Sequence, residues 1–348
     1  MTLVGSRYAT RQVDVTTLPE PAHTSYCRLH MRLGQERVPE DPPTPLHVVQ
    51  KRFRRRPAVM DATEWIVTEG DEVVAAANVV RWTQGSNPLW RDAWIGVLPE
   101  HRRRGIASSL VRRIVEAAAG QGDLVFGSDA NDRVPAGAAF HERIGARPGL
   151  SNRKSQAALA EVDRALMREW ASIDPAGYRL VWVSGDVPDE LMANAIVAYD
   201  AMNTAPRGDL QFGDWHTTAD EIRDWERLRR SSGYEQWLIL AIHEATGETA
   251  GFTQVQRHPD IPWEVKQQGT AVVPAHRGHG IGKWMKAEMV ERILREWADA
   301  TFIRTGNAYS NAPMLSINDR MGFRTVWSVV VWQSRHDDLV RYLEGRGL

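Results

Sequence analysis

Cysteine is almost absent from this sequence, and the shortage limits its chemistry. Cys27 is the only cysteine in 348 residues, so no disulfide can form within the chain. A chain without disulfides suits a reducing compartment, and we expect a cytoplasmic protein. No family signature surrounds Cys27, so two interpretations stay open: a reactive nucleophile or an ordinary packing residue.

Long apolar runs and an excess of one charge are also missing. No stretch of about 18 apolar residues occurs, which predicts no membrane-spanning helix. Residues Met1 to Val15 lack a basic region followed by an apolar run, so they do not resemble a signal peptide. Lysine and arginine number 43 against 44 acidic residues, and the formal net charge of −1 favours neither nucleic acid nor an anionic membrane as a partner.

What the sequence does contain is an internal repeat. Residues 97–107 are VLPEHRRRGIA and residues 272–282 are VVPAHRGHGIG. Both follow the pattern V-φ-P-x-H-R-x-x-G-I-[AG], where φ is apolar. The offset is constant, because 272 − 97 and 280 − 105 both equal 175, which is about half the chain. One offset of this size predicts two domains and not a solenoid of short repeats.

The segments that flank the repeat correspond as well. A short apolar run precedes each copy and predicts a buried strand. Helical spacing follows each copy, at Ile106, Leu110 and Ile114 and at Ile281, Met285 and Met289. A strand hairpin is expected upstream in each half, and a strand and a helix downstream.

The whole pattern predicts an α/β fold of two tandem domains, each a mixed sheet flanked by helices. We expect domains at residues 1–155 and 175–348. The connector at 156–174 has helical spacing at Leu159, Val162, Leu166 and Trp170.

The repeated string suits a bound diphosphate. An apolar strand leads through a proline into a basic, glycine-containing loop, and a long helix follows. A helix N-terminus presents unpaired backbone N–H groups and partial positive charge. Glycine lets the backbone approach a ligand closely, and arginine adds donors for phosphate oxygens. The alternative is two ordinary helix starts with solvated arginines.

Two other phosphate loops are excluded by spacing. The Walker pattern needs G-x4-G-K-[ST], whereas Gly278, Gly280 and Lys283 are spaced differently. The dinucleotide pattern G-x-G-x-x-G is not met either, because Gly278, Gly280 and Gly282 are evenly spaced.

The two strings R-x-x-G-x-[AG] resemble the acyl-coenzyme A loop of the GCN5-related N-acetyltransferase (GNAT) superfamily. The second half also has a string from Thr305 to Phe323 that is similar to tandem actinobacterial members such as mycothiol synthase. The resemblance implies a splayed mixed sheet, with the pantetheine arm between two parallel strands. It also implies acetyl-CoA as the donor and an amine as the acceptor.

Residues expected to contact acyl-CoA are carried over from the resemblance in both halves. They lie at the strand end, in the loop and at the helix start, and one lies further along: Val97, Leu98, Arg102, Arg103, Arg104, Gly105, Ile106 and Ala107; Val272, Val273, Arg277, Gly278, His279, Gly280, Ile281 and Gly282; and Asn311. Backbone N–H groups at Val97-Leu98 and Val272-Val273 are expected to polarise the thioester carbonyl.

Acetyl transfer needs a neutral amine, and the leaving thiolate can take a proton. Glu264 is our candidate base, with Asp92 as its counterpart in the first half; the alternative for Glu264 is a solvated strand-edge carboxylate. Many family members have a tyrosine four residues before the glycine of the closing G-F. Here those positions are His141 and Asn318, so His141 and the nearby Tyr309 are the candidate acids.

Two charged or metal-type patterns have simpler alternatives. His276 and His279 have H-x-x-H spacing without an evident third ligand, so we expect no metal. The basic run at residues 51–56 could contact nucleic acid or the 3′-phosphate of CoA, but a solvated face is the simpler interpretation.

The leading hypothesis is a small-molecule N-acetyltransferase that acts as a monomer or homodimer. An acyl-CoA-binding protein with structural or regulatory domains is the alternative, and a protein-lysine acetyltransferase would differ only in the acceptor. We expect the second half to perform the chemistry. Its loop has three glycines, and it has Asn311 seven residues before Asn318, where the first half has Val134.

Overall fold

The computed structural model describes residues 7–84 and 87–347. Residues 1–6 of the N-terminal stretch considered above lie outside the described residues. The chain divides into two compact units. Unit 1 comprises residues 1–151, 209–213 and 329–348, and unit 2 comprises residues 152–208 and 214–328. Among the described residues, no helix is both long enough and apolar enough to cross a membrane.

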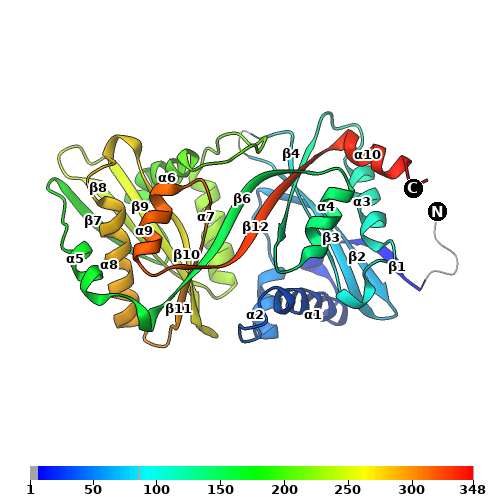
Figure 1. The fold of residues 1–348 in the computed structure, drawn as a ribbon, viewed down its shortest axis with the longest axis horizontal. Coiled ribbons are helices and arrows are strands. Elements are labelled where there is room, and N and C mark those ends of the chain that lie inside the picture. Colours follow the sequence, from blue (N-terminus) through cyan, green and yellow to red (C-terminus); the bar gives the residue numbers. More distant parts are fainter. Residues whose placement is uncertain (1–6, 85–86, 348) are drawn as a thin grey trace. The chain divides into compact units, whose positions relative to one another are not determined.

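Unit 1 is a mixed sheet with helices on its faces (Figure 1). Its strand order is β1-β2-β3-β4-β5-β12, and β4 and β5 are parallel while the other neighbours are antiparallel. The elements follow the expected order: β1 (Ala9–Val13), α1 (Glu20–Arg37), α2 (Leu46–Phe53), β2 (Met60–Glu69), β3 (Glu72–Trp82), β4 (Trp90–Val97), α3 (Ile106–Ala117), β5 (Val125–Asn131), α4 (Pro135–Arg143), the C-terminal part of β12 (Arg324–Arg335) and α10 (His336–Glu344).

Unit 2 repeats this arrangement, with strand order β6-β11-β10-β9-β8-β7 and one parallel pair, β10 with β11. Its elements are the C-terminal part of β6 (Arg147–Ala158), α5 (Arg164–Ala171), β7 (Tyr178–Ser184), α6 (Met192–Asp200), α7 (Ala219–Ser231), β8 (Glu235–His243), β9 (Thr249–His258), β10 (Ile261–Val272), α8 (Ile281–Glu296), β11 (Phe302–Ala308) and α9 (Ala312–Arg320).

The units differ from the expected contiguous halves in three segments. Residues 329–335 of β12 pair with β5 and complete the sheet of unit 1. Residues 152–158 of β6 pair with β11 and complete the sheet of unit 2. Residues 209–213 pack in unit 1, where Phe212 lies edge-on against Trp90 at 5.4 Å between ring centroids. β6 and β12 therefore each begin in one unit and complete the sheet of the other. A division of the sequence into two contiguous halves does not predict this.

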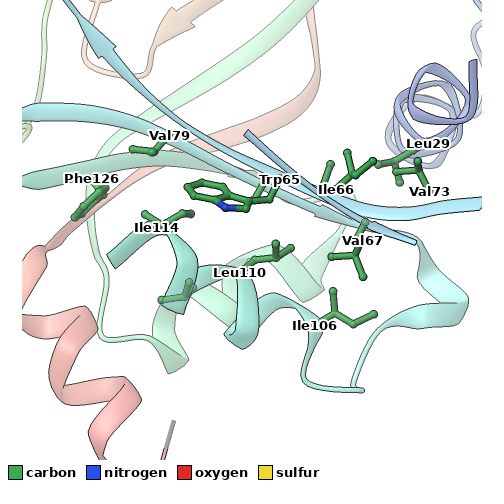
Figure 2. Packing of buried hydrophobic residues seen from close by; sticks show 14 of the residues in the cluster. Leu29, Trp65, Ile66, Val67, Val73, Val79, Ile106, Leu110, Ile114 and Phe126 are labelled. Carbon is green, nitrogen blue, oxygen red and sulfur yellow. The ribbon is translucent and has the colours of Figure 1, made fainter. Parts of the chain in front are cut away.

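The core of unit 1 shows why the helical spacing after the repeat matters. Ile106, Leu110 and Ile114 of α3 are buried and face Trp65 and Val67 of β2 (Figure 2). Figure 2 also shows Ile66, Leu29 and Val73 together on the α1 side of the same strands. Alternate residues of a strand point to opposite faces, so β2 buries Trp65 and Val67 on one side and Ile66 on the other. This packing fixes α3, and with it the loop that precedes α3.

The parallel strands are paired over only three residues in each unit. In unit 1, residues 90–92 pair with 125–127, and in unit 2, residues 264–266 pair with 302–304. Beyond these pairs β4 remains paired with β3, its neighbour on the other side, and β5 remains paired with β12. The same holds for β10 with β9 and for β11 with β6. Each parallel pair therefore splays at this point, and we call the two positions the splay of unit 1 and the splay of unit 2.

Candidate functional site

The two repeated loops have the same backbone conformation. Gly105 and Gly280 immediately precede α3 and α8 and have φ of 81° and 80°. Two residues earlier, Arg103 and Gly278 are also left-handed, with φ of 62° and 88°. Glycine adopts this conformation readily, whereas a residue with a side chain pays a steric penalty. Arg103 therefore occupies a glycine-type position, which indicates that the loop conformation is imposed in both units.

Both loops lead into a helix start suited to an anion. Among the described residues, no side chain caps the N-terminus of α3 or of α8. The first N–H groups of a helix have no partner inside the helix, and they carry partial positive charge. An uncapped start behind a left-handed loop therefore fits a phosphate or diphosphate.

The first arginine of each motif folds back onto the end of its strand. Arg102 Nε donates to the Val97 carbonyl and Arg277 Nε to the Val272 carbonyl, each at 3.0 Å. The remaining donors differ. The guanidinium of Arg102 binds both oxygens of Glu36 at 2.7 and 2.6 Å, whereas Arg277 donates to the hydroxyl of Thr204 at 2.6 Å. These arginines hold the loop to the strand in both units, and of the two, within the described part of the chain, Arg102 alone is paired with a carboxylate.

A tyrosine from the first strand region of each unit braces the loop histidine. The Tyr8 hydroxyl is 3.0 Å from His101 Nδ1, and the Tyr178 hydroxyl is 3.1 Å from His276 Nδ1. In unit 1, Arg104 also donates to the Tyr8 hydroxyl at 2.7 Å. The H-x-x-H pair thus has structural contacts of its own, and the described residues contain no group of three metal-type side chains.

The backbone donors expected at the strand ends need a correction. The N–H of Leu98 donates to Val74 at 3.0 Å, and the N–H of Val273 donates to Ala250 at 2.9 Å. These two groups are part of the sheet and cannot polarise a thioester. Along a strand, the backbone N–H groups of successive residues point alternately to the two neighbouring strands. Because the N–H groups of Leu98 and Val273 point to β3 and β9, those of Val97 and Val272 point away from these strands, toward the splay. Val97 and Val272 remain the candidate donors.

His141 lies on α4 beside the splay of unit 1 and forms two hydrogen bonds. Its Nδ1 is 2.8 Å from the Gly137 carbonyl, which can only accept, so Nδ1 carries the proton. Its Nε2 is 2.6 Å from the Ser128 hydroxyl and accepts from it. Burial lowers the pKa of His141, opposed by the Gly137 carbonyl and by Asp129. In this resting arrangement Nε2 of His141 is an acceptor, so it can donate a proton only after it has taken one from Ser128.

The corresponding position in unit 2 is Asn318 on α9. It is buried, and its Nδ2 donates to Asn307 Oδ1 at 2.8 Å. Its own Oδ1 is buried without a hydrogen-bond partner among the described residues, as is the hydroxyl of Ser155 on β6. Ser155 lies directly opposite Thr305 in the sheet. Unit 2 therefore has small polar side chains beside its splay, two of them with unsatisfied atoms. Asn311 caps α9 by accepting from the N–H of Met314.

The candidate base of unit 2, Glu264, and its second candidate acid, Tyr309, have side-chain partners of their own. Glu264, at the first parallel pair of β10, is close to Arg304 at 3.3 Å and to Lys266 at 3.6 Å. Glu264 is therefore ion-paired, which differs from the solvated strand-edge carboxylate of the alternative interpretation. Tyr309 is 48% exposed, and its hydroxyl is 2.8 Å from Ser328 Oγ.

Asp92 occupies the last parallel pair of unit 1, opposite Gly127. Its two oxygens accept from the indole nitrogens of Trp82 at 2.6 Å and Trp90 at 2.8 Å. A Cβ on Gly127 would lie 1.9 Å from the Trp90 ring, so glycine is required there. Since Asp92 shares its face of the sheet with Trp90, it lies on the face opposite to Ser128.

Two alternatives left open by the sequence are decided by their surroundings. Cys27 is fully buried on α1, and burial raises the pKa of its thiol to about 12, so it is a packing residue. In the basic run at residues 51–56, Arg54 binds Glu20 and Arg56 binds Asp14 and Glu64. Part of that run is thus neutralised within unit 1.

Sequence reasoning missed Ser128, Trp332 and Ser155 as site residues. Ser128 follows directly on the last parallel pair of β5, and the signal for it was a polar residue at the end of the apolar run 124–127. Trp332 and Ser155 had no comparable signal, because they come from strands whose pairing partners are distant in sequence.

The fold has counterparts among known proteins, and the sequence matches a family model. The sequence pattern of the acetyltransferase (GNAT) family matches residues 27–146 and 199–323. A tandem GNAT protein from the clavulanic acid biosynthesis pathway, solved without AcCoA, is 24% identical with a TM-score of 0.77, over 94% of this chain and 98% of that one. A GCN5-related N-acetyltransferase from Sphaerobacter thermophilus is 16% identical with a TM-score of 0.64, over 95% and 96% of the two chains.

A putative acetyltransferase from Pyrococcus horikoshii has the same fold at 13% identity and a TM-score of 0.53, over 96% and 91% of the two chains. No curated protein matches the sequence. The family match covers both halves, and in the described part of the chain each unit has a splayed sheet, a left-handed loop and a helix start without a side-chain cap. This chain belongs to the acetyltransferase (GNAT) family and has two GNAT domains in tandem.

Proposed function

We propose that the chain transfers the acetyl group of acetyl-CoA to an amine of a small molecule, by direct transfer within a ternary complex. The supporting observation is the side-chain set at the splay of unit 2. Ser155, Thr305 and Asn318 are small, polar and buried there, and Ser155 Oγ and Asn318 Oδ1 have no partner among the described residues. Buried polar atoms are normally satisfied, so a ligand with donors and acceptors, such as the pantetheine amides, fits this position.

The loop of unit 2 supports binding of the same donor. Gly278 and Gly280 are both left-handed, and α8 starts without a side-chain cap among the described residues. The N–H of Val272 faces the splay and is our candidate for polarising the thioester carbonyl. With Gly282 the loop has three glycines, and a Cβ at Gly282 would still be 3.6 Å from its nearest neighbours.

The acceptor amine has to lose a proton before it attacks. Glu264 is our candidate to receive that proton through water, since it lies on the strand that borders the splay and Lys266 and Arg304 stabilise its charge. Asn318 cannot donate a proton as an acid, so the thiolate leaves unassisted or takes a proton from Tyr309. The lack of an acid at position 318 also favours the alternative function, which is acyl-CoA binding without transfer.

An acceptor screen tests the proposal. Free CoA release is followed over a library of amino sugars, peptide-like amines and aminated antibiotics, with a matched reaction lacking amine as background. We expect at least one amine to raise the rate above background, and the product to have the mass of the acetylated amine. Stabilisation by acetyl-CoA without any acetylated amine would favour the binding function. Acetylation of lysine peptides alone would move the acceptor class to proteins.

A further inference from the structure

A serine and a histidine beside the splay of unit 1 are arranged as a nucleophile and its base. Ser128 is the first residue of β5 beyond the last parallel pair, which is Asp92 with Gly127. Its hydroxyl donates to His141 Nε2 at 2.6 Å. The other ring nitrogen of His141 donates to the Gly137 carbonyl at 2.8 Å, which fixes the ring orientation. Nucleophile, base and orienting group thus form a connected series.

A third residue makes the arrangement more than an isolated hydrogen bond. Trp332 lies directly opposite Ser128 in the sheet and stacks on His141, at 5.4 Å between centroids and 16° between planes. It is 7% exposed, and its indole N–H is buried without a hydrogen-bond partner among the described residues. Such a donor needs an explanation, and a ligand oxygen at this point supplies one.

We propose that unit 1 accepts the acyl group of an acyl-CoA thioester on the Ser128 hydroxyl. Ser128 Oγ forms a bond to the thioester carbonyl carbon, and its proton passes to His141 Nε2. The C–S bond then breaks, and the leaving sulfur takes that proton from Nε2. The products are acyl-Ser128 and CoA as a free thiol, with His141 again neutral. Water attacks the ester in the same way and releases the carboxylic acid.

The backbone of unit 1 suits this step. The N–H of Val97 points toward the splay and is a donor for the oxyanion that forms on the carbonyl, as is the unsatisfied Trp332 indole. The loop with Arg103, Gly105 and the start of α3 provides the phosphate-type site that acyl-CoA requires. Unit 2 has Thr305 and Asn318 at the places of Ser128 and His141, so the Thr305 hydroxyl has no base at the position equivalent to His141.

The inference rests on the proposed function only for acyl-CoA as the ligand, and its test needs no amine. Full-length protein is mixed with acetyl-CoA alone, quenched in acid, and mapped by peptide mass spectrometry. We expect one acetyl group on the Ser128 peptide, stable to neutral hydroxylamine and removable by alkaline hydroxylamine as an oxygen ester is, together with a burst of free CoA stoichiometric with protein.

Four variants make the result specific. Ser128→Ala and His141→Asn are expected to lose the label and the burst, while Ser151→Ala, which changes an exposed serine of unit 1, keeps both. Ser128→Cys is expected to trap the acetyl group as a thioester, which shows that the position reaches the ligand even if another variant folds poorly. Melting temperatures confirm that each variant is folded.

The proposal fails if the folded wild type binds acetyl-CoA, shown by a melting shift, yet has no acetyl group on Ser128 and no burst. It also fails if the label persists in Ser128→Ala. Acetylated amines with an unlabelled Ser128 would leave the transferase standing without this inference, and a labelled Ser128 without any acetylated amine would do the reverse.

Discussion

The two units share a loop and differ beside the splay. Unit 1 has Ser128, His141 and Trp332 where unit 2 has Thr305, Asn318 and Ser155. The aromatic and imidazole rings of unit 1 stack on each other, and a hydroxyl is paired with a base. Unit 2 has smaller side chains there and no titratable group among the three. Duplicated sheets and loops can therefore support different chemistry, because the reacting groups come from only a few side chains.

The loops differ in charge as well. The four residues from Arg102 to Gly105 include three arginines in unit 1, whereas the equivalent residues 277–280 include one. In unit 2, Ile173 also lies 3.2 Å from the position of a Cβ on Gly280, whereas a Cβ on Gly105 would meet nothing within 4 Å. The loop of unit 2 is thus more glycine-rich and more closely packed, and that of unit 1 is more cationic and more open.

The largest expected effect separates the two units by one substitution in each loop. Gly280→Val forces a branched residue into a left-handed conformation against Ile173, so the pyrophosphate site of unit 2 shifts. We expect amine acetylation to fall by about a hundredfold or more, since misplacement of a substrate by about 1 Å can cost that much. Gly105→Val is expected to retain most amine acetylation and to lose the Ser128 label instead.

Two measurements are made on the same variants. Steady-state CoA release in the presence of amine measures amine acetylation, and peptide mapping without amine measures the Ser128 label. Equal losses of amine acetylation from Gly280→Val and Gly105→Val, with both proteins folded, would show that the units share the transfer. Loss with Gly105→Val alone would place the amine chemistry in unit 1 and direct attention to Asp92.

The pH dependence of the two activities is expected to differ. Amine acetylation should rise from about pH 6 to pH 9, by up to about tenfold per pH unit, because the neutral fraction of a lysine-like amine rises that steeply below its pKa. Burial lowers the pKa of His141, which moves its titration below the ordinary range of histidine, so labelling of Ser128 should rise less between pH 6 and pH 9 than amine acetylation does. Rapid-quench rates at several pH values test both. A flat acetylation profile with chemistry rate-limiting would contradict amine transfer.

A buried lysine distinguishes the long helix of unit 2 from that of unit 1. Lys286 of α8 is 2% exposed, and burial lowers its pKa from 10.5 to about 7. Its counterpart is Val111, since 286 − 175 = 111, and Val111 is buried among apolar residues. Because unfolding restores the ordinary pKa, the unfolded chain binds more protons, and stability rises with pH between about 7 and 10.5.

Lys286→Met should therefore raise the free energy of unfolding at neutral pH by a few kcal/mol and flatten its rise toward pH 10. Urea unfolding at pH 7 and pH 9.5 measures both. The reciprocal change, Val111→Lys, is expected to destabilise the chain. A Lys286→Met protein that keeps the wild-type pH dependence would show that another group causes it.

Ligand binding is expected to stabilise the chain through both loops. CoA or acetyl-CoA at 100 times its dissociation constant should add about 2.7 kcal/mol for each site that binds it only in the folded state. Gly280→Val or Gly105→Val should each lose part of the melting shift, and the double variant should lose nearly all of it. Absence of any shift in the wild type at saturating CoA would count against two acyl-CoA sites.

The smallest expected effect concerns the left-handed position of the unit 1 loop that is not a glycine. Arg103 has φ of 62°, where unit 2 has Gly278. Arg103→Gly removes backbone strain of about 1–2 kcal/mol. The glycine also makes the unfolded chain more flexible, and the extra conformational entropy lost on folding costs about 0.5–1 kcal/mol. We expect a stability gain below about 1 kcal/mol, measured by urea unfolding, and weaker CoA binding by unit 1 because a cation is lost. A large destabilisation would mean that the Arg103 side chain makes contacts that hold the loop.

Much of the fold followed from local patterns. The repeat located both loops, and helical spacing at Ile106, Leu110 and Ile114 predicted the face of α3 that packs against β2. The order of strands and helices in each half was predicted because each element has its own periodicity. The last strand of each sheet was not predicted, since nothing local in residues 147–158 or 324–335 indicates which strand will pair with it.

The candidate site was predicted less fully than the fold. The acyl-CoA loops needed only a continuous motif, and such a motif is visible in sequence. The N–H groups of Leu98 and Val273 were assigned wrongly, because strand register alone decides which amides face a neighbour. His141 was identified from its spacing to Gly145, but its role as an acceptor depends on Ser128 and Gly137, whose geometry no spacing specifies.

By itself, the sequence determined two tandem α/β units, each with a basic, glycine-containing loop between a strand and a helix. These features are local: backbone freedom at Gly105 and Gly280 and the periodicity of apolar residues both act over a few neighbours. Only the tertiary structure decided which side chains meet at each splay. Ser128, His141 and Trp332 come from a strand, a helix and a strand separated by up to about two hundred residues, and hydrogen-bonding and stacking distances are set by the packing of the whole unit.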